Sequence, residues 1–223
     1  MRRTYGGMWK AAFVVVLVLF TAAVTSAAQI HTVPKLDQRV VDKLLDESLG
    51  DREVRINPGE TRVSELKGRF PIDKDKPVPE AILDFIGRHR AAFGLKNPQA
   101  ELRALQKDED SGHIIFEQVY NGVPVWGKQL GVTVVNGEIV HINGDNAPTP
   151  GIDTKPLITA EQAVGKVRDE KSGGRNEIVD GEARLVVYIS RKGRYYLAYH
   201  VHGQRLNYFV DATNGKILSR SNN

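Results

Sequence analysis

Apolar residues recur along the chain with helical spacing in some stretches and with strand spacing in others. Helical spacing marks residues 36–49, which Gly50 ends, and residues 79–93, which Gly94 ends. Between these two predicted helices, residues 51–78 are polar and are interrupted by prolines and glycines. This interval predicts short extended pieces joined by turns.

Strand-like patterning takes over after the second helix. The runs at 113–120 and 129–135 are rich in residues that favour β-structure, and an Asn-Gly pair follows each run, at 121–122 and 136–137. Asn-Gly favours tight turns because both residues tolerate positive φ. We therefore expect an antiparallel meander packed against the second helix.

A second unit follows a segment at 147–156, whose three prolines and one glycine are typical of a linker. Thr159 and Gln162 then predict a capping box at the start of a helix, which Gly173-Gly174 would break. The strands expected after that helix are 183–190, 194–202, 207–212 and 216–219. Each half has a helix and an antiparallel sheet whose apolar faces can bury each other, so the predicted fold class is α+β, with two small helix-on-antiparallel-sheet domains after an N-terminal signal peptide.

The signal peptide is predicted from the first 28 residues. A basic start precedes an apolar run at 11–24, which is too short to span a bilayer core of about 30 Å. Small residues at 26–28 place a cleavage site before Gln29. We expect an exported protein, secreted or held in the periplasm or cell envelope. The alternative to cleavage is an uncleaved N-terminal anchor.

Composition and charge narrow the function classes. The formal net charge is +4, but Arg2, Arg3 and Lys10 of the predicted signal carry three of these charges, so the exported part is close to neutral. A domain with so little net charge has a weak electrostatic drive toward nucleic acid, and no nucleic-acid partner is expected. The chain has no cysteine, which excludes disulfides, thiolate chemistry and cysteine-bound zinc.

Residues 112–144 carry a specific pattern of strand, turn and hairpin. This pattern resembles the fungalysin/thermolysin propeptide (FTP) domain of thermolysin-type (M4) metalloproteases. The matching residues are His113, Phe116, Gln118, Tyr120, Gly122, Val123, Pro124, Val125, Trp126, Gly127, Asn143 and Gly144.

The second unit resembles a PepSY domain, the module that follows in those propeptides. The similarity rests on the helix start at 158–164, the strand at 195–202, and the Val-Asp-Ala-x-x-Gly phrase that contains Asp211 and Gly215. The two resemblances divide the chain into the following parts: 1–28 signal peptide, 29–53 helical lead-in, 54–146 FTP-like domain, 147–156 linker and 157–223 PepSY-like domain.

The resemblance implies an exported, non-catalytic propeptide without the peptidase domain. It would act as an inhibitor or intramolecular chaperone of a thermolysin-type zinc metalloprotease, either in trans or as a truncated protease precursor. Its expected partner is the catalytic domain of such a protease. No membrane association is expected after signal cleavage.

An enzyme is not expected, and neither is a cofactor. No two of the six histidines flank a glutamate in the His-Glu-x-x-His spacing that binds catalytic zinc. The alternative that remains open is a stand-alone binding domain of the cell envelope, unrelated to proteases. His200 and His202 share a strand face as a candidate metal pair, although a solvated strand face is the preferred interpretation.

The motif residues are interpreted mainly as structural. Glycine permits positive φ, and asparagine can bond its own turn. Asp211 is expected to bond the turn at Thr213 or Asn214, and Trp126 is expected to pack in the core rather than to contact a partner. The residues given this structural role are Gln118, Tyr120, Gly122, Pro124, Gly127, Asn143, Asp211 and Gly215.

The C-terminal end is the candidate segment for contact with the protease. In the family that the chain resembles, the propeptide leads directly into the mature enzyme, which would place this end nearest the catalytic cleft. The segment is polar and has no large apolar anchor, so the sheet at 183–212 is expected to provide the docking surface. The tail consists of Ser219, Arg220, Ser221, Asn222 and Asn223.

Overall fold

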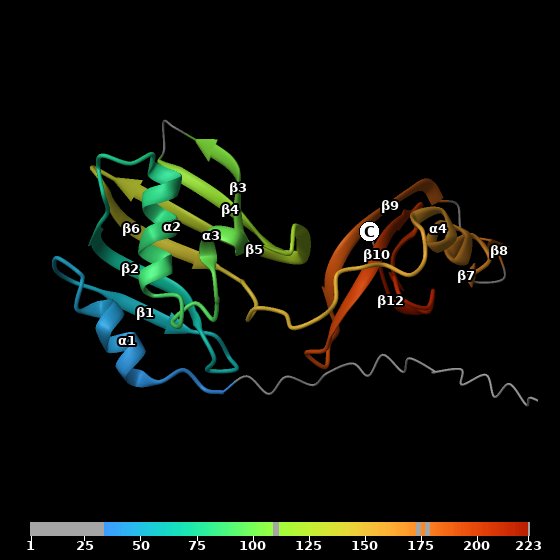
Figure 1. Cartoon of the computed structure of the whole chain (residues 1–223), viewed down its shortest axis with the longest axis horizontal. Helices are drawn as coiled ribbons and strands as arrows, with labels where there is room; N and C mark the ends of the chain where they lie inside the picture. Colours follow the sequence, from blue (N-terminus) through green and yellow to red (C-terminus); the bar gives the residue numbers. More distant parts are fainter. Residues whose placement is uncertain (1–33, 109–111, 173–174, 177–178, 223) are drawn as a thin grey trace, which may run out of the picture.

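The computed structural model describes residues 34–222, apart from 109–111, 173–174 and 177–178 (Figure 1). The elements gather in two lobes, each with a helix packed on strands. The expected signal peptide, the Gly173-Gly174 helix break and Asn223 lie outside the described residues. Within the described ranges, no helix is long and apolar enough to cross a membrane.

Over its described residues, the first lobe contains three helices and six strands. Its elements are α1 (Gln38–Leu45), β1 (Glu53–Ile56), β2 (Val63–Pro71), α2 (Val78–Arg88), α3 (Pro98–Glu101), β3 (Leu102–Asp108), β4 (His113–Tyr120), β5 (Val123–Val135) and β6 (Glu138–Gly144). The strands lie in the order β1-β2-β6-β5-β4-β3, and every neighbouring pair is antiparallel. The predicted meander and the strand at 113–120 are therefore confirmed.

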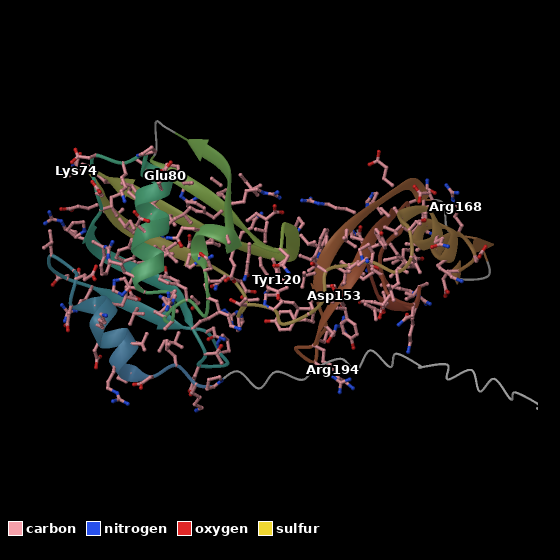
Figure 2. All side chains as sticks on the ribbon, in the orientation of Figure 1. Lys74, Glu80, Tyr120, Asp153, Arg168 and Arg194 are labelled. Atoms are coloured by element: carbon pink, nitrogen blue, oxygen red, sulfur yellow. The ribbon has the colours of Figure 1, made fainter. Side chains whose placement is uncertain are left out.

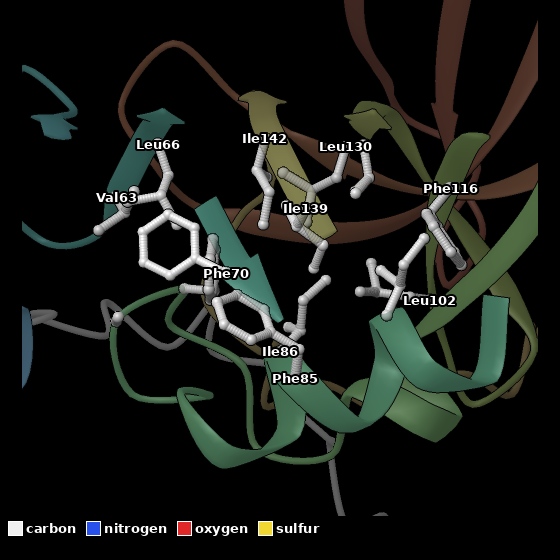
Figure 3. Close-up of a cluster of buried hydrophobic side chains, with 14 of the residues drawn as sticks. Val63, Leu66, Phe70, Phe85, Ile86, Leu102, Phe116, Leu130, Ile139 and Ile142 are labelled. Carbon is white, nitrogen blue, oxygen red and sulfur yellow. The ribbon is translucent and has the colours of Figure 1, made fainter. Parts of the chain in front are cut away.

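The core of the first lobe lies between the sheet and α2 (Figure 3). Ile82, Phe85 and Ile86 point from α2 toward the sheet and are fully buried. Phe70 of β2 meets Phe85 with ring centroids 5.5 Å apart. This burial is the largest favourable contribution to the stability of the lobe, because no disulfide is available.

Both predicted helices of this lobe are shorter than the sequence pattern suggested. The α1 helix starts after Asp37, which accepts a hydrogen bond from the Arg39 N–H, and the flanking residues bond to other segments instead. The Leu36 N–H donates to the Glu60 carbonyl, and the Leu49 N–H donates to the Arg69 carbonyl. Backbone bonds to other segments therefore hold both flanks of α1 outside the helix, and Leu49 itself is exposed.

The α2 helix ends at Arg88, and residues 89–94 form turns rather than continuing the helix to 93. In these turns the Ala92 N–H donates to the His89 carbonyl, and both Ala92 and Phe93 are buried. Phe93 therefore joins the core from a turn. Gly94 follows with φ +68°, as a chain reversal requires.

In its described part, the second lobe has one helix packed on a four-stranded antiparallel sheet, with a separate two-stranded hairpin. Its elements are α4 (Ala160–Arg168), β7 (Lys171–Ser172), β8 (Arg175–Asn176), β9 (Val179–Ile189), β10 (Tyr195–Gly203), β11 (Leu206–Asp211) and β12 (Ile217–Asn222). The capping box of Thr159 and Gln162 is confirmed, since each side chain bonds the backbone N–H of the other. Ala163, Val164 and Val167 of α4 are buried against the sheet.

The two lobes meet where β5 begins. Val125 of β5 pairs in parallel with Val187 of β9, so a single ten-stranded sheet runs through both lobes. The two valines are buried together with Ala147 and Tyr195 in a small core that we call the joint. The fold is therefore mixed α/β with one large sheet, and the division into two separate domains at the boundaries given above stays a prediction.

Polar contacts flank the joint. The Arg184 guanidinium of β9 donates to a Glu117 carboxylate oxygen of β4 at 3.3 Å. The hydroxyl of Tyr195 donates to the Pro148 carbonyl at 2.9 Å. Burial raises the pKa of Tyr195 to about 12, so this hydroxyl stays a hydrogen-bond donor across the neutral range. Figure 2 shows Tyr120 and Asp153 lying between the lobes.

The first residues of the predicted linker are bonded into the first lobe, and Ala147 is buried there. Gln118 is fully buried in β4 and bonds both backbone polar groups of one residue, Ala147. Its side-chain amide donates to the Ala147 carbonyl at 2.7 Å and accepts from the Ala147 N–H at 2.7 Å. The Gln118 side chain therefore supplies Ala147 with the two hydrogen bonds that a neighbouring strand would otherwise make.

Two further side chains hold the same segment. The buried amide of Asn146 donates to the Phe93 carbonyl. The Thr149 hydroxyl donates to the buried carboxylate of Glu101 at 2.6 Å, and this carboxylate also accepts the Asn97 N–H at 2.7 Å. Only residues 151–156 remain as a connection without helix or strand and with alternating exposure.

Replacing Gln118 with Ala is expected to lower the free energy of unfolding by about 2–4 kcal/mol, because it leaves the N–H and carbonyl of Ala147 buried without partners. Chemical denaturation of the purified chain measures this change. The matched control is Gln129→Ala, an exposed glutamine of β5, which should change the stability by at most about 0.5 kcal/mol. Equal effects of the two substitutions would show that the Gln118 bonds contribute nothing specific.

Limited proteolysis should cut the connection at 151–156 before it cuts at 146–150, because the latter residues are bonded into the first lobe. Mass spectrometry of the earliest fragments locates the cuts. Early cleavage at 146–150, or within β4 and β5, would contradict this arrangement of the segment.

Candidate protein-binding surface

The sheet of the second lobe has one covered face and one open face. Residues that point toward α4 include Leu197, Tyr199 and Val201 of β10, all buried. Alternate residues point to the other face, which we call the open face. Its centre is a smaller buried cluster of Val186, Ala198 and Phe209, with Tyr188 and Leu218 packed around it.

Four aromatic rings line the open face. The Tyr188 ring stacks on Phe209 with centroids 4.3 Å apart. Trp126 lies over His200 with centroids 4.1 Å apart and meets the edge of Phe209 at 5.3 Å. Trp126 is 39% exposed, so the expectation that it packs in the core is wrong. It comes from the first lobe but covers the sheet of the second.

The backbone around the FTP-like motif explains how Trp126 reaches this position. Asn121 and Gly122 both have positive φ, which confirms the predicted tight turn between β4 and β5. In the ladder that follows, Val119 opposes Pro124, but Glu117 opposes Gln129. The intervening part of β5 therefore bulges away from β4 and reaches β9.

Gly127 lies within this bulge and has φ +68°, a conformation that other residues adopt only with strain. It lets the chain leave the ladder at Val125, present Trp126 and return to the ladder. This position gives Gly122 and Gly127 the backbone role that the sequence predicted for them. The Trp-containing motif is thus the structural basis of the joint.

The other motif residues of the first lobe lie in two places. Tyr120 and Pro124 are half-buried, and Tyr120 packs against the joint. Asn143 is exposed in β6 opposite Gly131 of β5. A Cβ at Gly131 would lie only 2.8 Å from the Asn143 amide oxygen, so a larger residue there would displace the exposed Asn143 side chain.

His200 and His202 converge on one acceptor. Ring nitrogens of His200 and His202 lie 2.8 Å and 3.0 Å from the side-chain oxygen of Asn207. Among the residues that the structure describes, no three His, Cys, Asp or Glu side chains are placed to hold a metal ion. His200 is half-buried beneath Trp126, so it does not lie on the solvated strand face that the sequence favoured.

The environment of His200 disfavours its charged form. Burial lowers the pKa of His200, and the positive charges of His202 and Arg184 act in the same direction. The hydrogen bond to Asn207 opposes them, but the net shift is downward. The open face therefore has a neutral, aromatic centre near pH 7.

Asp211 bonds its own turn, as predicted. Its carboxylate accepts hydrogen bonds from the Thr213 N–H at 2.8 Å and from the Asn214 amide at 3.1 Å. Gly215 follows with φ +76° and lies close to Lys166 of α4. These contacts fix the turn between β11 and β12 and give Asp211 a structural position at the end of the sheet.

The C-terminal residues do not form a loose tail as far as Asn222. Ser219, Arg220, Ser221 and Asn222 belong to β12, which pairs with β11 at the edge of the sheet. Arg220 also pairs with Glu170. At the start of β12, Ile217 and Leu218 pack on opposite faces of the sheet, Ile217 in the α4-side core and Leu218 in the open-face cluster.

Comparison with known proteins supports the resemblance to the propeptide motif. Residues 100–146 match the family model described as Fungalysin/Thermolysin Propeptide Motif. The thermostable neutral protease NprT of Geobacillus stearothermophilus is 28% identical over 168 residues, covering 66% of this chain and 30% of that protein. Thermolysin of Alicyclobacillus acidocaldarius subsp. acidocaldarius is 28% identical over 169 residues, covering 67% of this chain and 31% of that protein.

A solved structure also aligns, at lower similarity. The Bacillus megaterium YpeB C-terminal domain is 16% identical, with a TM-score of 0.35, covering 83% of this chain and 95% of that one.

The chain therefore carries a fungalysin/thermolysin propeptide motif and is homologous to the propeptide regions of thermolysin-family proteases. It spans about 30% of the length of these curated relatives. The matched region includes β4, β5 and the Trp126 bulge that builds the joint.

Replacing His200 with Gln is expected to make folding stability less sensitive to acid. Since burial lowers the pKa of His200 in the fold, the unfolded chain binds the proton first as the pH falls below about 6.5, and stability declines toward acid. Gln stays neutral and keeps an N–H for Asn207. Melting temperatures between about pH 7.5 and pH 5 should therefore fall more steeply for the wild type than for the variant.

His141→Gln, in β6 of the first lobe, is the control for removing a histidine elsewhere; the His141 ring lies 3.0 Å from a Glu65 carboxylate oxygen, and Gln keeps an N–H for that bond. Parallel pH profiles for the wild type and His200→Gln would contradict the role given to burial at His200.

Proposed function

We propose that this protein acts as a propeptide that binds the peptidase domain of a thermolysin-family protease and inhibits it, assists its folding, or does both. The observation that carries the proposal is the homology to thermolysin-family propeptide regions, centred on the motif at 100–146. The second lobe is proposed to be a PepSY-like module. We further propose that the protein is exported after signal cleavage, as expected for a partner of a secreted protease.

The physical basis of both roles is preferential binding. A domain that binds the folded peptidase but not its unfolded chain lowers the free energy of the folded state by mass action. If the same domain lies across the catalytic cleft, it also excludes substrate. A tethered propeptide benefits from high effective concentration, whereas a separate chain must bind tightly by itself.

The lobes suggest a division of these tasks. The second lobe is proposed to dock on the peptidase, and the end of β12 to obstruct the cleft. Because Ser219–Asn222 are held in a strand, obstruction would come from exposed side chains such as Arg220 and Ser221 at a fixed sheet edge. A rigid edge loses less conformational entropy on binding than a loose tail does.

The protein itself is proposed to be non-catalytic. The curated relatives are matched over only about 30% of their length, as expected for a propeptide region. The described residues offer no side-chain cluster suited to catalytic zinc. Any peptidase effect of the chain would then depend on its partner.

The direct test adds the full chain to mature thermolysin and follows hydrolysis of a small peptide substrate. The expected result is saturable inhibition, with the chain remaining intact on a gel. Intact protein is the essential control, because a chain that is merely a competing substrate would be cleaved. A parallel refolding assay should show a higher yield of active thermolysin when the chain is present from the start.

Neither inhibition nor improved refolding at concentrations up to about 100 µM would contradict the proposal, since that limit corresponds to a binding free energy of only about 5.5 kcal/mol. The assay should also include a second enzyme, such as neutral protease NprT, because a propeptide that binds one protease of the family need not bind another.

A further inference from the structure

We propose that the open face of the second lobe, with Trp126 as its anchor, is the surface on which the peptidase domain docks. The inference rests on the propeptide role proposed above and identifies the residues that would carry it. The face is composite, because Trp126 belongs to β5 of the first lobe while His200 and Phe209 belong to the second.

The exposure of Trp126 is unusual for this molecule. Among the large hydrophobic side chains that stand exposed in the described ranges, it is the one aromatic residue. Tryptophan is enriched at the centres of protein interfaces, where a partner removes a large apolar area from water. Trp126 has an apolar surface already oriented for such a contact.

The Trp126 ring is also held in place before any partner binds. It stacks on His200, and Phe209 supports both rings from below, with centroids 5.3 Å from each. His200 is in turn bonded to Asn207. Since these contacts restrict the rotamer of Trp126, ordering it on binding costs little, which favours affinity.

The homology to thermolysin-family propeptide regions makes a peptidase domain the occupant of this face. Asn222 pairs with Leu206, and Ser219 pairs with Phe209, so the end of β12 lies only three residues, about 10 Å, beyond the aromatic cluster. The curated relatives extend well beyond the matched region, which covers about 30% of their length. A peptidase domain docked on the open face would therefore also lie within reach of the end of β12.

The test measures the affinity of full-length variants for mature thermolysin whose catalytic glutamate has been replaced, so that the chain is not cleaved. Trp126→Ala should weaken binding by about 30-fold, the scale of an interface anchor, and Trp126→Phe by only a few-fold. The matched control is Leu157→Ala, at a 72% exposed residue that lies outside the cluster, with an effect of at most about twofold.

Trp126→Ala also removes packing at the joint, so two independent measurements accompany it. His202→Glu puts a charge at the exposed rim of the face without altering the joint, and should weaken binding by about tenfold. In a chain labelled with 5-fluorotryptophan, the ¹⁹F resonance missing from Trp126→Phe should shift or broaden when inactive thermolysin is added.

The outcomes separate the inference from the proposed function. If the wild type binds but folded Trp126→Ala and His202→Glu bind equally well, the docking face lies elsewhere and the propeptide role stands. An unchanged Trp126 resonance in the bound state has the same meaning. If the wild type binds neither inactive thermolysin nor inactive neutral protease NprT, the proposed function fails. If sedimentation shows that Trp126 mediates a dimer of the free chain that thermolysin does not disrupt, the occupant is a second copy and the inference is overturned.

Discussion

The structure depends on one interruption of a β-ladder. Where Glu117 opposes Gln129 and Val119 opposes Pro124, β5 bulges away from β4 and pairs with β9 instead. This bulge extends the sheet from one lobe into the other, buries Val125 against Val187, and sets Trp126 over the second sheet. The lobes are therefore joined by sheet pairing and burial as well as by the connection at 151–156.

The sequence predicted those features that depend on local patterns. The strand at 113–120, both Asn-Gly turns and the capping box at Thr159 follow from nearby residues and were confirmed. The helix ends were wrong because the backbone beside α1 bonds to segments distant in sequence, and because Phe93 joins the core from a turn after α2. The bonds at the start of the predicted linker could not be predicted either, since Gln118 lies far from Ala147 in sequence but bonds its backbone N–H and carbonyl.

The candidate surface was predictable only in part. Family resemblance marked the residues around Trp126, but alternation cannot show that a first-lobe side chain covers a second-lobe sheet. Likewise, the polar composition of Ser219–Asn222 suggested a loose tail, although edge strands are commonly polar. What unites the propeptide motif with the proposed docking face is geometry: the same bulge joins the lobes and presents the Trp126 ring to solvent.

The central claim is that the joint holds both lobes as one body that presents a composite face. Residual dipolar couplings of backbone N–H groups test it directly, because each rigid body has its own alignment tensor in a weakly ordered medium. The expected result is one tensor that fits the strands of both lobes, with the lobes oriented as in Figure 1. Two tensors of clearly different magnitude would contradict the claim, since they would show lobes that reorient independently about the 151–156 connection.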